Sequence, residues 1–211
     1  RVIRRILEEI DIDPKQFPPR SVLGVISDAK NNLQNPEQLS KRTETYRDEV
    51  ISRIYEAYEA ALHRANAVDF DDLLSKTYTL LEGHTEILEK YQQRYEYLLV
   101  DEFQDTNPLQ FQVARLLALK SRNICVVGDP DQSIYSWRHA DPSNLTDFQS
   151  TFNETKIVTL DQSYRSTQII LEAADSVIGN NDERMEKNLW TENDRGSRIT
   201  VAEAYNEEEE A

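Results

Sequence analysis

The second half of the chain contains three short apolar runs, and an aspartate follows each run within two residues. The runs cover residues 97–100, 123–127 and 156–160 and are partly β-branched. A helical pattern that begins at Pro108 separates the first two. Buried strands that alternate with helices are typical of a parallel α/β sheet. Because parallel strands present their carboxyl ends at one edge, we expect the polar residues after the runs to converge on one crevice.

The first half of the chain, up to about residue 92, has helical periodicity instead. Apolar residues recur at every fourth position over residues 46–62 and predict a long amphipathic helix. The sequence Asn-Pro-Glu at 35–37 is a start signal before it. A shorter helix is expected at about 22–33. The acidic residues at 69–72 open a further helix, where capping is their simplest role.

Beyond the third apolar run, Ser166 is expected to cap a helix that ends at Gly179. A last strand is expected at 198–204, ahead of the acidic tail at 207–210. The predicted fold class is therefore α/β, with a partial parallel sheet that follows an all-helical subdomain.

Composition limits the classes of function. The 211 residues carry a formal net charge of −15, which argues against unaided nucleic-acid binding because phosphate contacts need Lys and Arg. The single cysteine, Cys125, excludes a disulfide framework and favours a reduced, cytoplasmic setting. No apolar stretch approaches membrane length. The chain starts at Arg1 inside a helical pattern, so we expect it to be a piece of a longer protein.

The first apolar run ends in the sequence VDEFQDTN, which places Asp101 and Glu102 side by side. An acid at the end of an apolar strand that holds Mg²⁺ is the Walker B arrangement of nucleotide hydrolases. Successive strand residues point to opposite faces, so Glu102 is free to orient or deprotonate a water instead. The alternative is a pair of solvated or helix-capping acids.

The second run leads into the sequence VVGDPDQSIYSWRHA. Gly128 permits close approach of another backbone, and Gln132 has the reach for a phosphate oxygen or the attacking water. Tyr135, Trp137 and Arg138 place two rings and a cation within four residues, which suits stacking on unpaired bases. The alternative for Trp137 is a core or interface residue.

The third run leads into LDQSYRST. An arginine such as Arg165 can stabilise the charge of a transferring phosphoryl group when it is delivered across a cleft. The alternative role for Arg165 is an ordinary surface salt bridge. Tyr164 either stacks on a nucleotide base or packs against the protein.

These three blocks resemble motifs II, III and IV of the UvrD/Rep/PcrA-type helicases of superfamily one, in the same order and spacing. The resemblance covers nearly the whole chain. It implies a RecA-like (P-loop NTPase) sheet and ATP-dependent translocation along single-stranded DNA in the 3′-to-5′ direction, with duplex unwinding. It also implies three parts: a partial helical insertion (1–68), the later half of the first motor domain (69–160) and the start of the second (161–211).

The resemblance implies a role for each residue at the nucleotide. Asp101 would hold Mg²⁺, and Glu102 would be the catalytic base. Gln132 would sense the γ-phosphate of ATP, and Arg165 would reach it from the second motor domain. Tyr164 would stack on the adenine.

At the DNA, the resemblance implies that Tyr135 and Trp137 contact the single strand and that Arg138 couples the two sites. The chain departs from the family at His139, where glycine is usual, and at Ser163, where asparagine is usual. These departures put the local turn and one polar contact in doubt.

A larger departure is the phosphate loop G-x-x-x-x-G-K-[ST], which none of the five scattered glycines can build. The isolated chain is therefore expected not to hydrolyse ATP. Two alternatives stay open: a stand-alone, non-catalytic helicase-like binding module, and the helicase part of a helicase–nuclease. An incomplete sheet would also expose a strand edge, through which we expect self-association.

Overall fold

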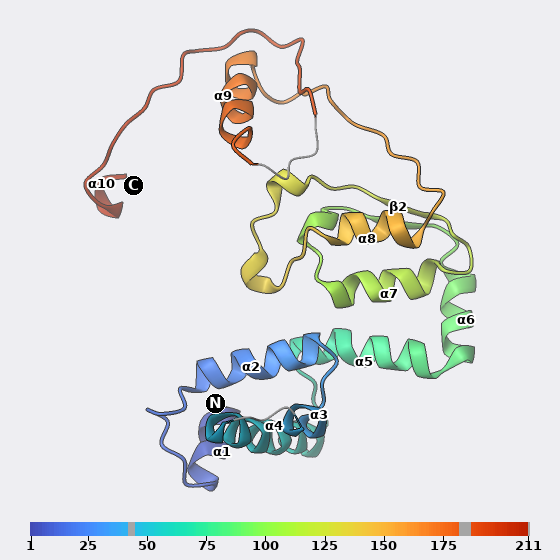
Figure 1. Ribbon diagram of the computed structural model, residues 1–211, viewed down its shortest axis with the longest axis vertical. Helices are drawn as coiled ribbons and strands as arrows, with labels where there is room; N and C mark the ends of the chain where they lie inside the picture. Colours follow the sequence, from blue (N-terminus) through green and yellow to red (C-terminus); the bar gives the residue numbers. More distant parts are fainter. Residues whose placement is uncertain (42–44, 182–186, 211) are drawn as a thin grey trace.

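The computed structural model describes residues 1–41, 45–181 and 187–210. Its first part is a helical lobe, at the bottom of Figure 1, built from four helices: α1 (Val2–Glu9), α2 (Pro19–Asn31), α3 (Pro36–Ser40) and α4 (Tyr46–Arg64). These helices share one apolar core, whose fully buried members include Leu7, Val22, Ile26, Val50 and Ile54. The predicted long amphipathic helix is confirmed as α4.

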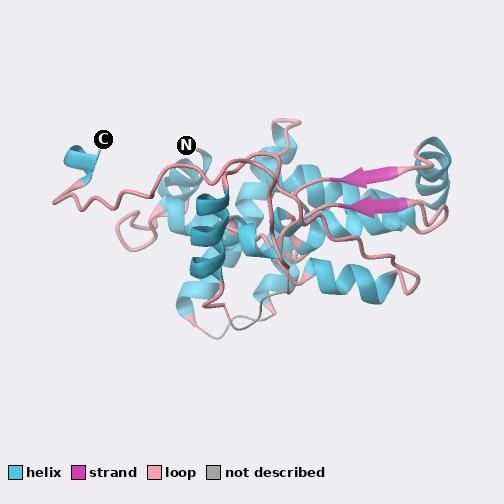
Figure 2. Ribbon diagram, turned by 90° about the horizontal axis from the view of Figure 1, so that it is seen from above, coloured by secondary structure: helices cyan, strands magenta, loops and turns pink. Residues whose placement is uncertain are grey.

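Two helices, α5 (Phe70–Gly83) and α6 (Thr85–Arg94), lead from the helical lobe to the sheet. The sheet has two parallel strands, β1 (Leu98–Val100) and β2 (Ile124–Val126), with α7 (Pro108–Ala118) between them in the chain. Figure 2 shows the two strands side by side and pointing the same way. The first two predicted strands and the intervening helix are confirmed.

The core beside the sheet is aromatic. Phe103 packs edge-on against Phe111 and Phe148, with ring centroids 5.7 and 5.8 Å apart. Phe148 belongs to α8 (Asn144–Thr151), a helix that the sequence did not predict. Short 3₁₀ turns, η1 (Phe103–Asp105), η2 (Pro130–Gln132) and η3 (Ser136–Arg138), follow the strands.

The two later strand predictions are wrong. Residues 156–160 and 198–204 are extended but belong to no strand of the described chain, and large side chains such as Ile157, Leu160 and Val201 are exposed. A β-branched run becomes a strand only where a neighbour satisfies its backbone hydrogen bonds, and no described strand pairs with these segments. An isolated parallel bridge between Gln162 and Trp190 is the remaining pairing described in this region.

The predicted helix starts need two corrections. The cap at Asn35 does not open the long helix. It forms a capping box with Gln38 on the five-residue α3, and Thr45 caps α4 through its own box with Asp48. Ser166 is not a helix cap either: α9 (Gln168–Ile178) begins after Thr167 and ends at Gly179 as expected.

The chain ends in an exposed segment and a short acidic helix, α10 (Glu207–Glu210). In the described part of the chain, no helix is both long and apolar enough to cross a membrane.

A buried ammonium group joins the helical lobe to α5. Lys30 of α2 is 3% exposed, and its Nζ lies 2.6 Å from Glu59 Oε1, 2.8 Å from Asp69 Oδ2 and 2.9 Å from Asp72 Oδ1. Asp69 and Asp72 also form the predicted capping box of α5. The capping prediction is thus confirmed, but the lysine partner was not foreseen.

The charges of this cluster depend on one another. Burial opposes the charge of Lys30, yet its hydrogen bonds to the three carboxylates outweigh burial and raise its pKa above the ordinary lysine value. Burial likewise opposes the charge of Asp72, yet the hydrogen bonds from Lys30 and Lys76 lower its pKa. Burial and the nearby carboxylates raise the pKa of Tyr58, whose hydroxyl donates to Asp69, to about 12.

We predict that Lys30→Met lowers the free energy of unfolding by about 3 kcal/mol, because it leaves buried carboxylates without their counter-charge. Urea unfolding followed by circular dichroism measures the change. Lys41→Met is the matched control: it breaks the exposed pair with Glu37, which contributes less than about 0.5 kcal/mol. Equal effects of the two substitutions would contradict the prediction.

The stability that this cluster confers should depend on pH. The lowered pKa of Asp72 stabilises the fold above the ordinary aspartate pKa, and this is lost as pH falls through the lower folded value. The raised pKa of Lys30 stabilises the fold below the ordinary lysine pKa, and this is lost as pH rises through the folded value. The difference between wild type and Lys30→Met should therefore be flat from about pH 5 to 9 and shrink below about pH 4. A difference that persists in acid would contradict this.

Candidate functional site

The pair of acids after β1 is held in a specific geometry. Asp101 Oδ1 accepts a hydrogen bond from the backbone N–H of Glu102 at 2.9 Å. Glu102 has a left-handed backbone, with φ of 49°, an uncommon conformation for a residue with a side chain. Its Oε2 accepts from Gln104 Nε2 at 2.9 Å. Both acids are exposed, and each has one carboxylate oxygen held by a hydrogen bond at the end of the strand.

Gln104 connects this pair to the segment after β2. The side chain is 1% exposed, and its Oε1 accepts from the backbone N–H of Asp129 at 2.9 Å. The backbone N–H of Phe103 donates to the carbonyl of Val127, also at 2.9 Å. A Cβ on Gly128 would lie 2.8 Å from Gln104 Oε1, so glycine is required for this approach. The prediction that Gly128 permits close backbone contact is confirmed, whereas the bridging role of Gln104 was missed.

Asp129 is the centre of a second polar cluster. Its carboxylate accepts from the backbone N–H of Asp131 at 3.0 Å, from Gln132 Nε2 at 2.8 Å and from the ammonium group of Lys187. Lys187 also lies 2.8 Å from Asp131 Oδ2. Burial opposes the charge of Asp129, but the hydrogen bonds from Lys187 and Gln132 outweigh it and lower its pKa. No local sequence signal pointed to Lys187, because its partners lie far away in the chain.

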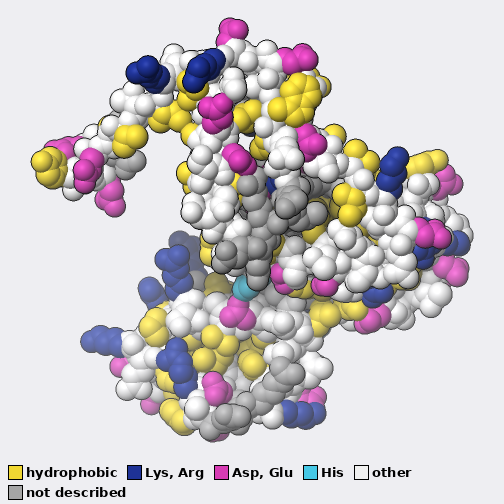
Figure 3. Space-filling view, turned by 45° about the horizontal axis from the view of Figure 1, so that its top comes forward, with side chains coloured by type: hydrophobic (Ala, Val, Ile, Leu, Met, Phe, Trp, Pro, Cys, Tyr) yellow, Lys and Arg dark blue, Asp and Glu magenta, His cyan; other side chains and the backbone are white. Residues whose placement is uncertain are grey.

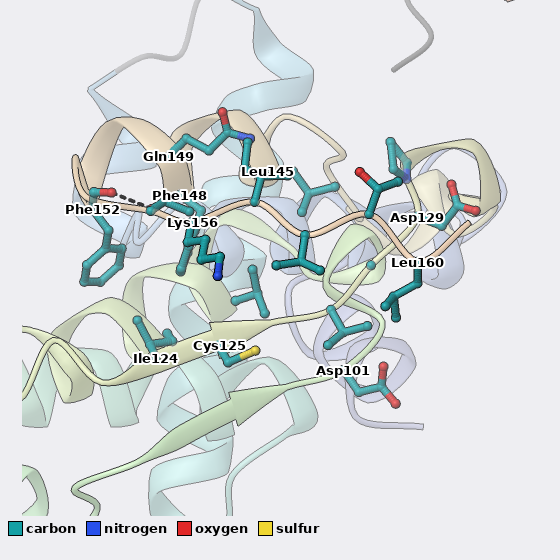
Figure 4. Close-up of a pocket in the computed structure, with 18 of the residues that line it drawn as sticks. Asp101, Ile124, Cys125, Asp129, Leu145, Phe148, Gln149, Phe152, Lys156 and Leu160 are labelled. Atoms are coloured by element: carbon teal, nitrogen blue, oxygen red, sulfur yellow. Dashed lines mark hydrogen bonds between the residues drawn. The ribbon is translucent and has the colours of Figure 1, made fainter. Parts of the chain in front are cut away.

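A pocket of about 870 Å³ joins the two clusters (Figure 4). Its lining includes Asp101, Glu102, Asp129, Gln132 and Lys187, and Figure 4 shows Asp101 and Asp129 toward the same end. Its other walls are largely apolar and come from β2, α8 and the extended segment 156–160. The expected convergence is thus found for the ends of the first two strands.

The residues after the third apolar run are placed elsewhere. Neither Tyr164 nor Arg165 lines this pocket, and both are exposed in the described chain. The hydroxyl of Tyr164 donates to Gln162 Oε1 at 2.8 Å. The structure therefore brings Asp101, Glu102 and Gln132 together but keeps Arg165 apart from them.

The aromatic pair lies in the turn at residues 135–139, which is called the aromatic turn below. Trp137 is 68% exposed, which rules out the core alternative, and its ring centroid lies 6.2 Å from that of Tyr135. The turn closes at His139, whose φ of 64° is left-handed. The chain therefore keeps the turn that a glycine would favour, although it has histidine there. The side chain of Arg138 lies outside the part that the structure describes.

The acids at the end of β1 fit a magnesium ion. Mg²⁺ prefers oxygen ligands and is bound in nucleotide hydrolases through one or two carboxylates together with phosphate oxygens. Asp101 is exposed at the pocket and has one oxygen held by its neighbour's N–H, which orients the carboxylate. Among the described residues, no group of three or more His, Cys, Asp or Glu could hold a metal ion by itself. Asp101 and Glu102 supply carboxylate oxygens of the kind that bind a metal together with phosphate oxygens.

Comparison with known proteins identifies the family to which the chain belongs. Residues 1–153 match the UvrD/REP helicase N-terminal domain, and residues 158–211 match the UvrD-like helicase C-terminal domain. The chain belongs to the UvrD/Rep helicase family.

Sequence identity to individual relatives supports the same family. The chain is 48% identical over 206 residues to the ATP-dependent DNA helicase PcrA of Bacillus subtilis (strain 168). It is 44% identical over 210 residues to the PcrA helicase of Leuconostoc citreum, and 45% to that of Staphylococcus aureus (strain Mu50). These matches cover 98–100% of this chain but only 28–29% of each relative. The chain therefore spans less than a third of their length.

We predict that Gly128→Ala destabilises the protein by about 1–3 kcal/mol, because the added methyl group separates Gln104 from the segment after β2. Thermal or urea unfolding tests this. Gly24→Ala is the matched control, since nothing lies within 4 Å of its Cβ position and alanine favours the helix. A neutral effect at position 128 would mean that the close approach is not required.

Proposed function

We propose that this chain is part of an ATP-dependent DNA helicase that couples ATP hydrolysis to 3′-to-5′ movement on single-stranded DNA and to duplex unwinding. The observation that carries the proposal is the Gln104 side chain, which binds Glu102 on one side and the backbone of Asp129 on the other. One buried amide thus links the acids of the pocket to the segment that leads into the aromatic turn. The relatives are named ATP-dependent DNA helicases, which supports the helicase part of the proposal.

At the nucleotide, Asp101 would hold Mg²⁺, which supplies charge neutralisation at the phosphates. Glu102 would accept a proton from the attacking water. Its carboxylate keeps one oxygen on Gln104 and has the other for the water. Gln132 would sense the γ-phosphate; its amide is held by Asp129 at the same pocket.

Two nucleotide contacts require a change of position. Arg165 would approach the γ-phosphate, and Tyr164 would stack on the adenine. Both side chains lie outside the pocket and are exposed. We infer that these two residues act after the segment that carries them closes on the first motor domain. The proposed parts are a partial helical insertion at residues 1–68, the later half of the first motor domain at 69–160 and the start of the second at 161–211. The break between the two matched domains at residues 153–158 supports the last boundary.

At the DNA, the exposed rings of Tyr135 and Trp137 would stack on bases of the single strand, and Arg138 would couple this contact to the nucleotide. Stacking needs no sequence readout, which suits a motor that moves over any sequence. The process that we propose for the protein is DNA repair, and its proposed location is the cytoplasm. Self-association through a free edge of β1 or β2 is also proposed, because each has one described neighbour and Leu99 is 78% exposed.

Glu102→Gln in the full-length protein should lower DNA-stimulated ATP hydrolysis by about 10²–10⁴-fold, because an amide cannot accept the proton of the attacking water. Steady-state phosphate release measures this. Binding of a fluorescent ATP analogue with Mg²⁺ is the control and should stay unchanged. An unchanged hydrolysis rate would remove Glu102 from the role of base.

The 211 residues by themselves should show no ATP hydrolysis, because they contain no phosphate loop to cradle the β- and γ-phosphates. The measurement is phosphate release from the isolated chain with and without oligo-dT. DNA-stimulated release that Glu102→Gln abolishes would contradict this expectation. Tight oligo-dT binding without hydrolysis would fit the binding-module alternative as well, and a nuclease domain in the full-length protein would favour the helicase–nuclease alternative.

A further inference from the structure

The last turns of α2 touch both segments that leave the candidate site. Asn107, directly before α7, donates from its Nδ2 to Asn31 Oδ1 at 3.0 Å. His139, at the end of the aromatic turn, places its Nε2 3.3 Å from Asp28 Oδ1. Asp28 and Asn31 lie one turn apart on the same helix. In Figure 3 a histidine and an acidic side chain lie together where the helical lobe meets the rest of the molecule.

Asp28 lies at a helix end that contacts of its neighbours Lys30 and Asn31 hold in place. Lys30, on the same turn, is fixed by the buried carboxylates described above. Asn31 also donates to Asp71 Oδ1 at 2.9 Å and thus binds α5 as well as Asn107. The carboxylate of Asp28 therefore extends from a helix end whose position is set by contacts on both sides of it.

Three backbone hydrogen bonds are described at the closing end of the aromatic turn. Its backbone closes through the N–H of His139 on Ser136 and that of Ala140 on Tyr135, at 2.9 and 3.2 Å. The N–H of Asp141 then donates to the carbonyl of Thr106 at 3.0 Å. Among these contacts, only the imidazole of His139 reaches the helical lobe.

At position 139 the backbone conformation costs histidine free energy that it would not cost glycine. A left-handed backbone costs a residue with a side chain about 1–2 kcal/mol, and His139 has φ of 64°. The imidazole in return supplies a ring nitrogen to Asp28, which glycine cannot. Resting on the proposed function, we propose that His139 and Asp28 are positioning residues that hold the turn with Tyr135 and Trp137 against α2 and so set the rings for single-stranded DNA.

The size of the effect follows from exposure. The side chains of His139 and Asp28 are 39% and 60% exposed, so solvent screens the pair. Loss of such a contact should weaken DNA binding by about twofold to fivefold. In this proposal His139 and Asp28 set the position of the Tyr135 and Trp137 rings, and the rings themselves bind the DNA.

The test is a double-mutant cycle in the full-length protein, with binding of oligo-dT as the readout. His139→Gly and Asp28→Ala should each weaken binding by about twofold to fivefold, and the double variant should be no weaker than either. His139→Gln should bind within about twofold of wild type, because its amide donor has about the reach of Nε2. Additive losses, or no loss in either single variant, would overturn the proposal.

Asn66→Gly is the matched control. It relieves another left-handed residue, with φ of 48°, without touching Asp28. It should bind DNA like wild type, and a loss equal to that of His139→Gly would assign the effect to backbone strain and overturn the proposal.

A second readout separates this inference from the proposed function. In a Trp190→Phe background, Trp137 is the one tryptophan of these 211 residues. His139→Gly should shift its emission in the absence of DNA, and His139→Gln should restore it. If Trp137→Ala binds DNA as well as wild type, the proposed DNA contact fails while the emission still tests positioning. An unchanged emission overturns the positioning role.

Discussion

A buried ammonium group surrounded by three carboxylates fixes how the two halves of this molecule meet. Lys30 comes from α2, Glu59 from α4, and Asp69 and Asp72 from the first turn of α5. A charge this deeply buried is tolerated only while its partners stay in place, so the cluster favours one arrangement of three helices. Because α5 also packs on α7, that arrangement extends to the sheet.

The two strained backbone positions of the site share a structural cause and a role. Glu102 and His139 both adopt left-handed conformations, and both are held by side-chain contacts, Glu102 through Gln104 and His139 through Asp28. Strained conformations persist where the surroundings determine them, and they concentrate where side chains must be aimed. In this chain they aim a carboxylate into the pocket and close the turn that carries the exposed rings.

The sequence predicted those features whose cause is local. The apolar period of α4 and the capping acids of α5 depend on residues one turn apart, and both predictions were right. The runs that end at β1 and β2 were recognised because each is followed by polar residues. Asp101, Glu102 and Gln132 could therefore be placed at one pocket from the sequence.

Features that depend on distant partners could not be predicted this way. The run at 156–160 has strand composition, but a strand also needs a neighbour, and the described chain offers none. No local pattern marks Lys30 or Lys187, because their carboxylate partners lie far away in the sequence. The bridging role of Gln104 depends on its burial and on its contact with Asp129, which no local pattern reveals.

The most direct test of the account is whether DNA controls hydrolysis through the aromatic turn. The measurement is ATP hydrolysis by the full-length protein as oligo-dT is added, for wild type and for Trp137→Ala. The account predicts that oligo-dT accelerates hydrolysis by the wild type, and that the variant needs a higher oligo-dT concentration for the same acceleration. A rate that does not respond to DNA, or an identical response in the two proteins, would contradict it.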